Sequence, residues 1–497
     1  MRVAAVLAPM LAALVGCFAP VYDQPRCGPG DTCPAPLVCS GELCLPPAEL
    51  VDAAIDSLST TDALDATDGP ACTPRCEDRD GTAFAVTCTA ADEACPLGCT
   101  IAGGVHCQAL VPSNGVTAAD LAGADLDLVL EPDRLYLLDG DTGLLRSYAA
   151  NGSGAGAVVR AAGVGLDVVS HVRFRVTAPV GTAPGLAVLG VHGLTVPVTT
   201  VLRAVGSRAV VIVARGPIAV AGAIDAGAGY GPGPLAPVSV AAAGPGGGRG
   251  AIDAATPAQG CAPGGAGTHA AATNRDTGGG GGGLGLAGGR GGASTAGSDD
   301  GGSAVAGGML GAVCGQTHLV PLRGGSGGGM GQGGDDGGGG GGALQLTSLT
   351  AIAVSGTLQA GGAGGDGSLS RGGGGGGGSG GALLLEAPAI TIDGARVVTG
   401  GGGGGDGNGI DDAGDNGRRD GQPAPSSGNG GRGGTGPDPG AGEFTAADGS
   451  RPGQPTGGGT GGGGGGSGIV HFRSLSTPSQ TGAVVRPTAS ISVAAIN

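Results

Sequence analysis

Carboxylates that could cleave a polysaccharide are few in the strand-forming part of this chain of 497 residues. Glycosidic chemistry needs two or three acidic side chains on one groove, often beside a cationic residue or His. The three recurring segments described below contain only Asp225, Glu386 and Asp393 as acids. Alignment of these segments places Asp393 opposite Ser355 and Ala221, so no column of acids repeats. We therefore expect no catalytic residues and no cofactor. A polysaccharide lyase or hydrolase is kept as the alternative hypothesis to a protein without catalytic activity.

Calcium binding is the other chemistry that the residue types allow. Asp366 and Asp406 close the runs GGAGGD and GGGGGD, which resemble the opening of the RTX nonapeptide GGxGxDxUx. The apolar position of that repeat is Ser368 in the first run and Asn408 in the second. Because the motif is incomplete in both runs, Asp366 and Asp406 are only weak Ca²⁺ candidates. A weakly Ca²⁺-binding, RTX-like surface protein is a further alternative.

The 13 cysteines divide into one single residue, Cys17, and three even sets. The sets are Cys27, Cys33, Cys39 and Cys44; Cys72, Cys76, Cys88, Cys95, Cys99 and Cys107; and Cys261 and Cys314. Even sets behind an export signal predict disulfides formed in an oxidising compartment. Zinc is the competing interpretation, because two pairs in the second set have the spacing of zinc ligands. His106 is the only His near those pairs, which favours disulfides.

Residues 1–16 have the anatomy of an export signal, with Arg2 followed by the apolar run AAVLAPMLAALV. The run is too short to span a bilayer. It ends in Leu-Val-Gly-Cys17, which resembles the bacterial lipobox. The resemblance implies cleavage before Cys17 and lipidation of this residue, and thus a membrane partner held through the lipid. Phe18 follows in place of the Asp that suggests inner-membrane retention, so we expect an outer-membrane lipoprotein exposed at the surface.

The charge balance bears on the partners of the chain. Acidic residues number 40 against 24 basic ones, for a net charge of −16. Such a surface repels phosphate backbones, so no nucleic-acid partner is expected. The chain also lacks Trp, which leaves few aromatic platforms for stacking sugars or bases.

A repeat organises the strand-forming part of the chain. Residues 209–227 align without gaps with 343–361 at an offset of 134, and a third copy starts at Ala382. Each copy holds three short apolar runs separated by corners, which predicts three strands. Stacked units of this kind are typical of a parallel β-solenoid. In the third copy Arg396 takes the apolar slot of the third strand, so either its register slips or Val397 takes over.

Composition shifts along the chain predict a modular, all-β protein in which disulfide-rich modules precede the solenoid. The expected segments are a signal peptide at 1–16, the lipidated Cys with the first Cys-rich module at 17–47, an acidic linker at 48–71, a second Cys-rich module at 72–112, a β region with the first coil at 113–229, a Gly-rich insertion at 230–342, coils with Gly tracts at 343–468, and a C-terminal cap at 469–497.

Long Gly runs separate the coils. They span 278–283, 337–342, 372–378, 400–405 and 461–466. Flexible linkers are one interpretation, because Gly loses the most backbone entropy on ordering. Packed polyglycine-II helices are the other, and we favour them because long structureless insertions within one domain are uncommon. Cys261 and Cys314 bracket part of the largest insertion, where a disulfide would oppose fraying.

The lipobox, the Cys-rich modules and the pattern GGGGGGALQL…GGGGGGGSGGALLLEAPAITI together resemble the glycine-rich surface lipoproteins frequent in myxobacteria. They are superficially similar to the PGRS repeats of mycobacterial surface proteins. The resemblance implies a cell-surface location and no established activity. We therefore expect a lipid-anchored structural or adhesive protein, with extracellular matrix, a glycan or another cell surface as its partner.

Overall fold

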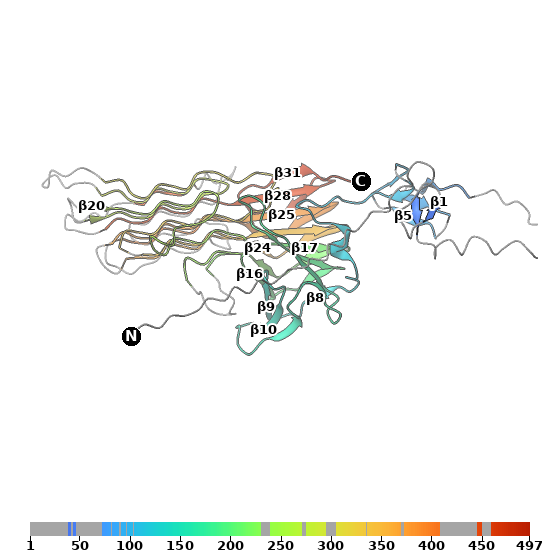
Figure 1. Cartoon of the computed structure of the whole chain (residues 1–497), viewed down its shortest axis with the longest axis horizontal. Helices are drawn as coiled ribbons and strands as arrows, with labels where there is room; N and C mark the ends of the chain where they lie inside the picture. The colour runs from blue at the N-terminus through green and yellow to red at the C-terminus, as the bar shows by residue number, and fades with distance from the viewer. Residues whose placement is uncertain are drawn as a thin grey trace, which may run out of the picture. The chain divides into compact units, whose positions relative to one another are not determined.

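Short parallel strands joined by tight corners dominate the computed structural model (Figure 1). It describes residues 38–40, 43–45, 72–80, 82–88, 91–95, 97–102, 104–229, 239–270, 275–294, 305–333, 335–368, 372–407, 445–449 and 459–497. The chain divides into two units, Met1–Cys72 and Thr73–Asn497. In the first unit, β1 (Val38–Ser40) pairs antiparallel with β2 (Leu43–Leu45).

The second unit begins with small antiparallel sheets held by disulfides. One sheet contains β3 (Arg75–Arg79), β4 (Thr82–Val86) and β5 (Glu93–Cys95), and another contains β6 (Cys99–Thr100) and β7 (His106–Cys107). Disulfides join Cys76 to Cys99 and Cys95 to Cys107. Cys72 and Cys88 are disulfide-bonded as well. Disulfides, and not zinc, are therefore confirmed for the second Cys-rich module. The side chains of Cys17, Cys27, Cys33, Cys39 and Cys44 lie outside the described residues.

Three larger sheets form the body of the second unit. Sheet 1 has the order β12 (Gly165–Leu166), β13 (Arg173–Val176), β14 (Leu186–Val191), β17 (Ala209–Ala214), β22 (Ala343–Ser348), β25 (Ala382–Ala387), β28 (Ile469–Ser474) and β31 (Ser490–Val493). Sheet 2 has the order β29 (Ser479–Thr481), β26 (Ala389–Asp393), β23 (Ala351–Val354), β18 (Ile218–Val220), β15 (Leu194–Val196) and β8 (Leu128–Val129). Sheet 3 has the order β11 (Ala157–Arg160), β10 (Leu145–Ala149), β9 (Arg134–Asp139), β16 (Val201–Val205), β19 (Ala223–Asp225), β24 (Thr357–Gln359), β27 (Arg396–Val398) and β30 (Val484–Arg486).

Each pass of the chain adds one strand to each of these sheets. Strand β17 leads to β18 and then to β19, and the next pass places β22, β23 and β24 beside them in parallel. The predicted register is confirmed at Val210–Leu344 and Ile218–Ile352. In the third copy Val397 pairs with Leu358, so Val397 takes the apolar slot and Arg396 is exposed.

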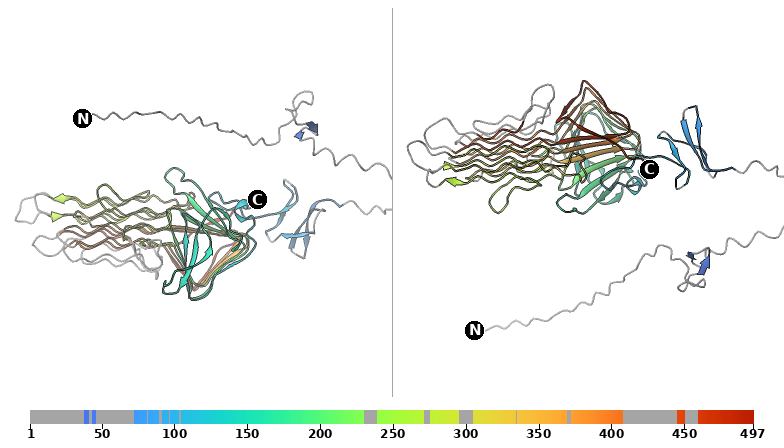
Figure 2. Two further views of the ribbon diagram at one scale, coloured as in Figure 1. Left: turned by 60° about the horizontal axis from the view of Figure 1, so that its bottom comes forward. Right: turned by 90° about the horizontal axis from the view of Figure 1, so that it is seen from above.

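The three sheets surround a common interior (Figure 2). Their inward side chains form one hydrophobic cluster. Ile212, Ile218 and Ile224, which come from three different sheets, are each at most 1% exposed. Burial of each such side chain contributes about 1.5–3 kcal/mol, and neighbouring passes of the chain supply the contacts. A single pass could not bury these residues, so the strands depend on stacking.

The outer face of sheet 1 is covered as well. Val211 and Val213 of β17 pack there against Val116, Leu121 and Leu322. Val116 precedes the 3-10 helix η2 (Ala118–Leu121), and Leu121 is its last residue. Burial on both faces explains why AVVIVA and ALLLEA are nearly continuous apolar runs. Sheet 2 is covered on one face only, and β26 alternates between exposed and buried residues accordingly.

The Gly runs lie side by side and extend away from the strands, towards the hairpin of β20 (His269–Ala270) and β21 (Arg275–Asp276) (Figure 1). Every residue of the five runs is buried. The run 372–378 bonds to each of the other four runs: Gly279 N to Gly374 O at 3.0 Å, Gly338 N to Gly376 O at 2.8 Å, Gly402 N to Gly378 O at 2.9 Å, and Gly377 N to Gly463 O at 2.9 Å. These bonds favour packed Gly runs over flexible linkers.

Close packing of the Gly runs requires the absence of a side chain. A Cβ added at Gly376 would meet the carbonyl oxygen of Gly280 more closely than real Cβ atoms approach, and one at Gly377 would meet that of Gly402. The Cys261–Cys314 disulfide crosslinks the same region, as predicted.

The described residues include no α-helix. Their one 3-10 helix, η2, is too short to span a bilayer.

Candidate functional site

A solvent-open groove follows strand β13 and the loop that joins it to β14. It consists of three neighbouring cavities of about 440, 390 and 290 Å³. The first and second cavities share Gly115, and the second and third share Ala183 and Pro184. We call these three cavities the β13–β14 groove.

One end of the groove is built around an ion pair. Arg175 donates to the carboxylate of Asp120 from Nε at 2.5 Å and from Nη2 at 2.9 Å, a bidentate arrangement. Burial opposes ionisation of Asp120, but hydrogen bonds from Arg175 and Thr117 outweigh it and lower the pKa of Asp120. Gly190 of β14 allows this packing, because any Cβ there would overlap the carbonyl oxygen of Asp120.

The middle of the groove is apolar. Its walls include Val180, Leu186, Val320, Pro321 and Leu322. Val180 is 76% exposed and Val320 is 45% exposed, so both apolar side chains face solvent. A ligand with an apolar segment would bury them on binding.

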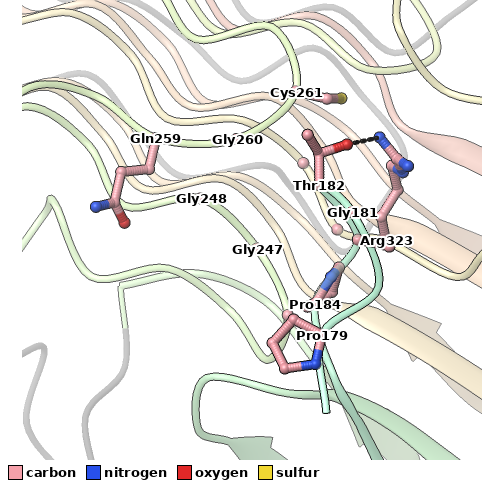
Figure 3. Close-up of a pocket in the computed structure, with 14 residues that line it drawn as sticks. Pro179, Gly181, Thr182, Pro184, Gly247, Gly248, Gln259, Gly260, Cys261 and Arg323 are labelled. Atoms are coloured by element: carbon pink, nitrogen blue, oxygen red, sulfur yellow. Dashed lines mark hydrogen bonds between the residues drawn. The ribbon is translucent and has the colours of Figure 1, made fainter.

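The far end of the groove lies between the β13–β14 loop and the Gly-rich segments (Figure 3). Gly247, Gly248 and Gly260 form one wall, and Pro179 and Pro184 stand on the other. Arg323 Nη1 donates to Thr182 Oγ1 at 3.4 Å across the end of the cavity. Backbone groups, the Arg323 guanidinium, and the side chains of Thr182 and Gln259 are the polar groups at this end.

The groove has an excess of positive charge on an acidic protein. Of the described residues that line it, Arg173, Arg175 and Arg323 are basic and Asp120 alone is acidic. Arg175 is neutralised by Asp120, whereas Arg173 Nη1 donates to the carbonyl oxygen of Ala122. The balance favours a ligand that carries a carboxylate or another acidic group.

A buried polar network supports the wall of the groove. Glu386 is fully buried on the outer face of sheet 1, and its carboxylate accepts hydrogen bonds from Gln345 at 2.7 Å and Thr347 at 3.0 Å. Arg473 Nη1 donates to the same carboxylate at 2.6 Å. The backbone N–H of Ser113 donates to it at 3.2 Å. The charge of Glu386 is therefore paired within the fold.

Asn114 connects this network to the groove through hydrogen bonds. Its side chain donates to Gln345 at 2.9 Å and to the carbonyl oxygen of Leu319 at 3.1 Å. It also accepts from the backbone N–H of Leu322 at 3.0 Å. Because Asn114 and Leu322 both line the groove, sheet 1 fixes the groove's floor.

His471 lies beside the network as a second buried polar group. Its ring nitrogens lie 2.6 Å from Ser490 Oγ and 2.9 Å from Ser492 Oγ. The His318 ring meets it edge to face at 5.3 Å between centroids. Burial, followed by the proximity of His318, lowers the pKa of His471 to about 4. A neutral His471 is therefore part of the packed strands.

The acids considered for glycosidic chemistry lie apart. Asp225 belongs to sheet 3, Glu386 to sheet 1 and Asp393 to sheet 2. Asp225 is buried, accepts from Gly227 N at 2.9 Å, and lies 3.5 Å from Arg203 Nε. The structure therefore does not bring these three carboxylates onto one groove.

The weak calcium candidates lie on adjacent segments. Ser368 N donates to the carbonyl oxygen of Asp406 at 2.8 Å, and Asp366 N donates to that of Asp336 at 2.8 Å. Burial raises the pKa of Asp336, and the charges of Asp366 and Asp253 raise it further. Within the described part of the chain, no three His, Cys, Asp or Glu side chains form a group that could hold a metal ion. Calcium binding by Asp366 or Asp406 stays a prediction.

The sequence did not indicate Arg173, Arg323 or Asn114 as site residues. Each lies in a segment without a motif, and Asn114 is 231 residues from its partner Gln345.

A comparison of the chain with family models, curated proteins and solved structures finds no match.

Proposed function

We propose that the chain is a lipid-anchored structural and adhesive protein of the cell surface. In this proposal Cys17 carries the lipid, and the strands of the second unit form the body of the protein. The location rests on the export signal and lipobox of the sequence, and the disulfides are consistent with export.

We also propose that the stacked strands form a parallel β-solenoid and that the Gly runs adopt the polyglycine-II conformation. Three sheets that each gain one strand per pass support the solenoid. Hydrogen bonds between the run 372–378 and each of the other four Gly runs support the polyglycine-II block.

The observation that carries the proposal is the packing of the Gly runs. The chain contains 118 Gly, and the described runs are buried against one another through backbone bonds. A block without side chains has no functional groups for catalysis, but it can form a stiff scaffold. The β13–β14 groove, on the body from which this block extends, supplies a place for an acidic ligand to bind.

The alternative from sequence, a polysaccharide-active enzyme, needs convergent acids. Asp225, Glu386 and Asp393 lie in three sheets, and Glu386 is paired with Arg473. No observation favours this alternative over a binding role.

Binding assays test the proposal. Protein comprising residues 18–497, folded under oxidising conditions, would be applied to whole cells, extracellular matrix, and arrays of neutral and carboxylated glycans. We expect retention on cells or matrix and a preference for carboxylated ligands. Substitution of both Arg173 and Arg323 with Ala should reduce retention about tenfold or more, as loss of two charge contacts would.

Arg396→Ala is the matched control, because Arg396 is exposed on β27 and does not line the groove. It should bind as the unchanged protein does. Absence of binding to every surface, or release of shortened glycan by the protein, would contradict the adhesive role. Equal loss in the control would show that charge in general, and not the groove, governs retention.

A further inference from the structure

The last strand of each large sheet lies at one end of the stack. Strands β29, β30 and β31 each end the strand order of their sheets. All three pair in parallel with the preceding pass, through β26, β27 and β28. Their outer edges therefore face the same way, and each edge carries backbone groups that another strand can pair with.

This end leaves the hydrophobic interior uncovered. Phe472 of β28 is fully buried, whereas Ile491, which lies opposite it on β31, is 51% exposed. Val493 continues the same row and is 79% exposed. Val485 on β30 lies opposite the fully buried Val397 and is only half-buried. The C-terminal cap predicted for 469–497 therefore ends in an exposed apolar row.

The segment that follows β31 is held in place by residues 109–111. Val111 N donates to the carbonyl oxygen of Ala495 at 2.8 Å, and Asn497 N donates to that of Ala109 at 3.1 Å. Leu110 and Ile496 form an antiparallel bridge beside them. The edge is thus preformed, and a partner would not need to order it.

The exposed end also lacks the charges that usually protect edge strands. No Asp or Glu follows Asp448 in the chain, and strands β29 to β31 contain one charged residue, Arg486. Proteins commonly place charges or bulges at strand edges to prevent pairing. The opposite end of the stack is closed by antiparallel hairpins such as β9–β10–β11. It is also rich in acids: Asp120, Asp125, Asp127, Glu131, Asp133, Asp139, Asp141 and Asp167.

We propose that this end is a homodimer interface, in which two copies of the chain pack end to end through β29, β30 and β31. A two-fold axis can place the β31 edge antiparallel to the same edge of the second copy, which suits backbone pairing between them. Arg486 is the one charged residue in these three strands, so two copies can meet here with little repulsion although each carries a net charge of −16. The near absence of charge on this face also disfavours a partner that would be recognised through charge.

Light scattering on the full chain in detergent, analysed for protein mass apart from detergent mass, tests the proposal. We expect a dimer that resists reduction of disulfides. Ile491→Lys combined with Val493→Lys should weaken dimerisation about tenfold or more, because two charges per copy would meet at the interface. Both residues are largely exposed, so the variant should keep its fold, which circular dichroism would verify.

Val168→Lys combined with Val169→Lys is the matched control, because these residues are 78% and 85% exposed and precede β13, away from β31. The control should remain dimeric. A monomer at about 100 μM, ten times above a 10 μM dissociation constant, would overturn the proposal. Open-ended oligomers would overturn the two-fold contact, and a dimer that survives the β31 substitutions would place the interface elsewhere. Ile491→Ala with Val493→Ala separates loss of apolar contact from added charge and should weaken the dimer less.

Discussion

Glu386 on β25 and Arg473 on β28 lie directly opposite each other on neighbouring parallel strands, with 2.6 Å between the carboxylate and Nη1. Glu386 is fully buried and the Arg473 side chain is 20% exposed. A carboxylate removed from water must be paired, and four hydrogen-bond donors surround this one. The pair joins the last passes of the chain to the segment that forms the floor of the groove.

Glu386→Gln should destabilise the protein by about 3 kcal/mol, because Arg473 would keep its charge in a mostly buried place without a carboxylate. Chemical denaturation would measure the loss. Asp393→Asn, at an exposed position on β26, is the control and should change stability by less than about 0.5 kcal/mol. Equal effects of the two substitutions would contradict a special role for the buried pair.

His471 should make the protein less stable in acid. Its folded pKa of about 4 lies below the ordinary value of 6.5, so the unfolded chain binds a proton first as the pH falls. The stability that neutral His471 contributes is complete above pH 6.5 and is lost between about pH 6.5 and 4, by up to about 3 kcal/mol. Melting temperatures across this range would show the slope. A slope unchanged by His471→Gln would show that other groups cause it.

Gly376→Ala should lower stability by about 1–3 kcal/mol or prevent the Gly runs from packing, because the new Cβ would overlap the carbonyl oxygen of Gly280. Gly216→Ala is a milder control, since a Cβ there would lie 3.2 Å from the carbonyl oxygen of His192 and needs only a small shift. Thermal melts of both variants provide the comparison. Equal tolerance of the two changes would mean that the run 372–378 is not packed as described.

Removal of the Cys261–Cys314 disulfide should also cost stability. The two cysteines are 53 residues apart, and a loop of that length implies about 4 kcal/mol of lost crosslinking entropy. Urea denaturation of the doubly substituted Cys261→Ser/Cys314→Ser protein would measure this. A midpoint equal to that of the unchanged protein would show that the Gly-rich segment folds independently of the crosslink.

The repeat could be recognised from sequence where the turns between its strands have equal lengths in both copies. Residues 209–227 and 343–361 align without gaps because both passes turn in the same way, and the structure pairs them in that register. The preceding pass, β14 to β16, was not recognised as a copy. Leu189 pairs with Ile212 and Leu202 pairs with Ile224, but the corners between these positions differ in length, which breaks the alignment.

The groove and its supporting network could not be predicted from sequence. The contacts of Asn114 with Leu319, Leu322 and Gln345 join segments more than 200 residues apart. No local pattern of residues marks such a contact, because it depends on which passes of the chain become neighbours. The exposed apolar end of β31 was also missed, since a Ser-Ile-Ser-Val strand has the same alternation whether or not another strand covers it.

Amide hydrogen exchange of the Gly run 372–378 would measure whether the Gly runs are packed against one another. We expect strong protection, comparable with that of the strands, because Gly374 to Gly378 each donate a backbone hydrogen bond inside a buried block. Protection should fall in Gly376→Ala and persist in Gly216→Ala. Exchange of this run at the rate of an unfolded peptide, beside protected strands, would contradict a packed Gly scaffold.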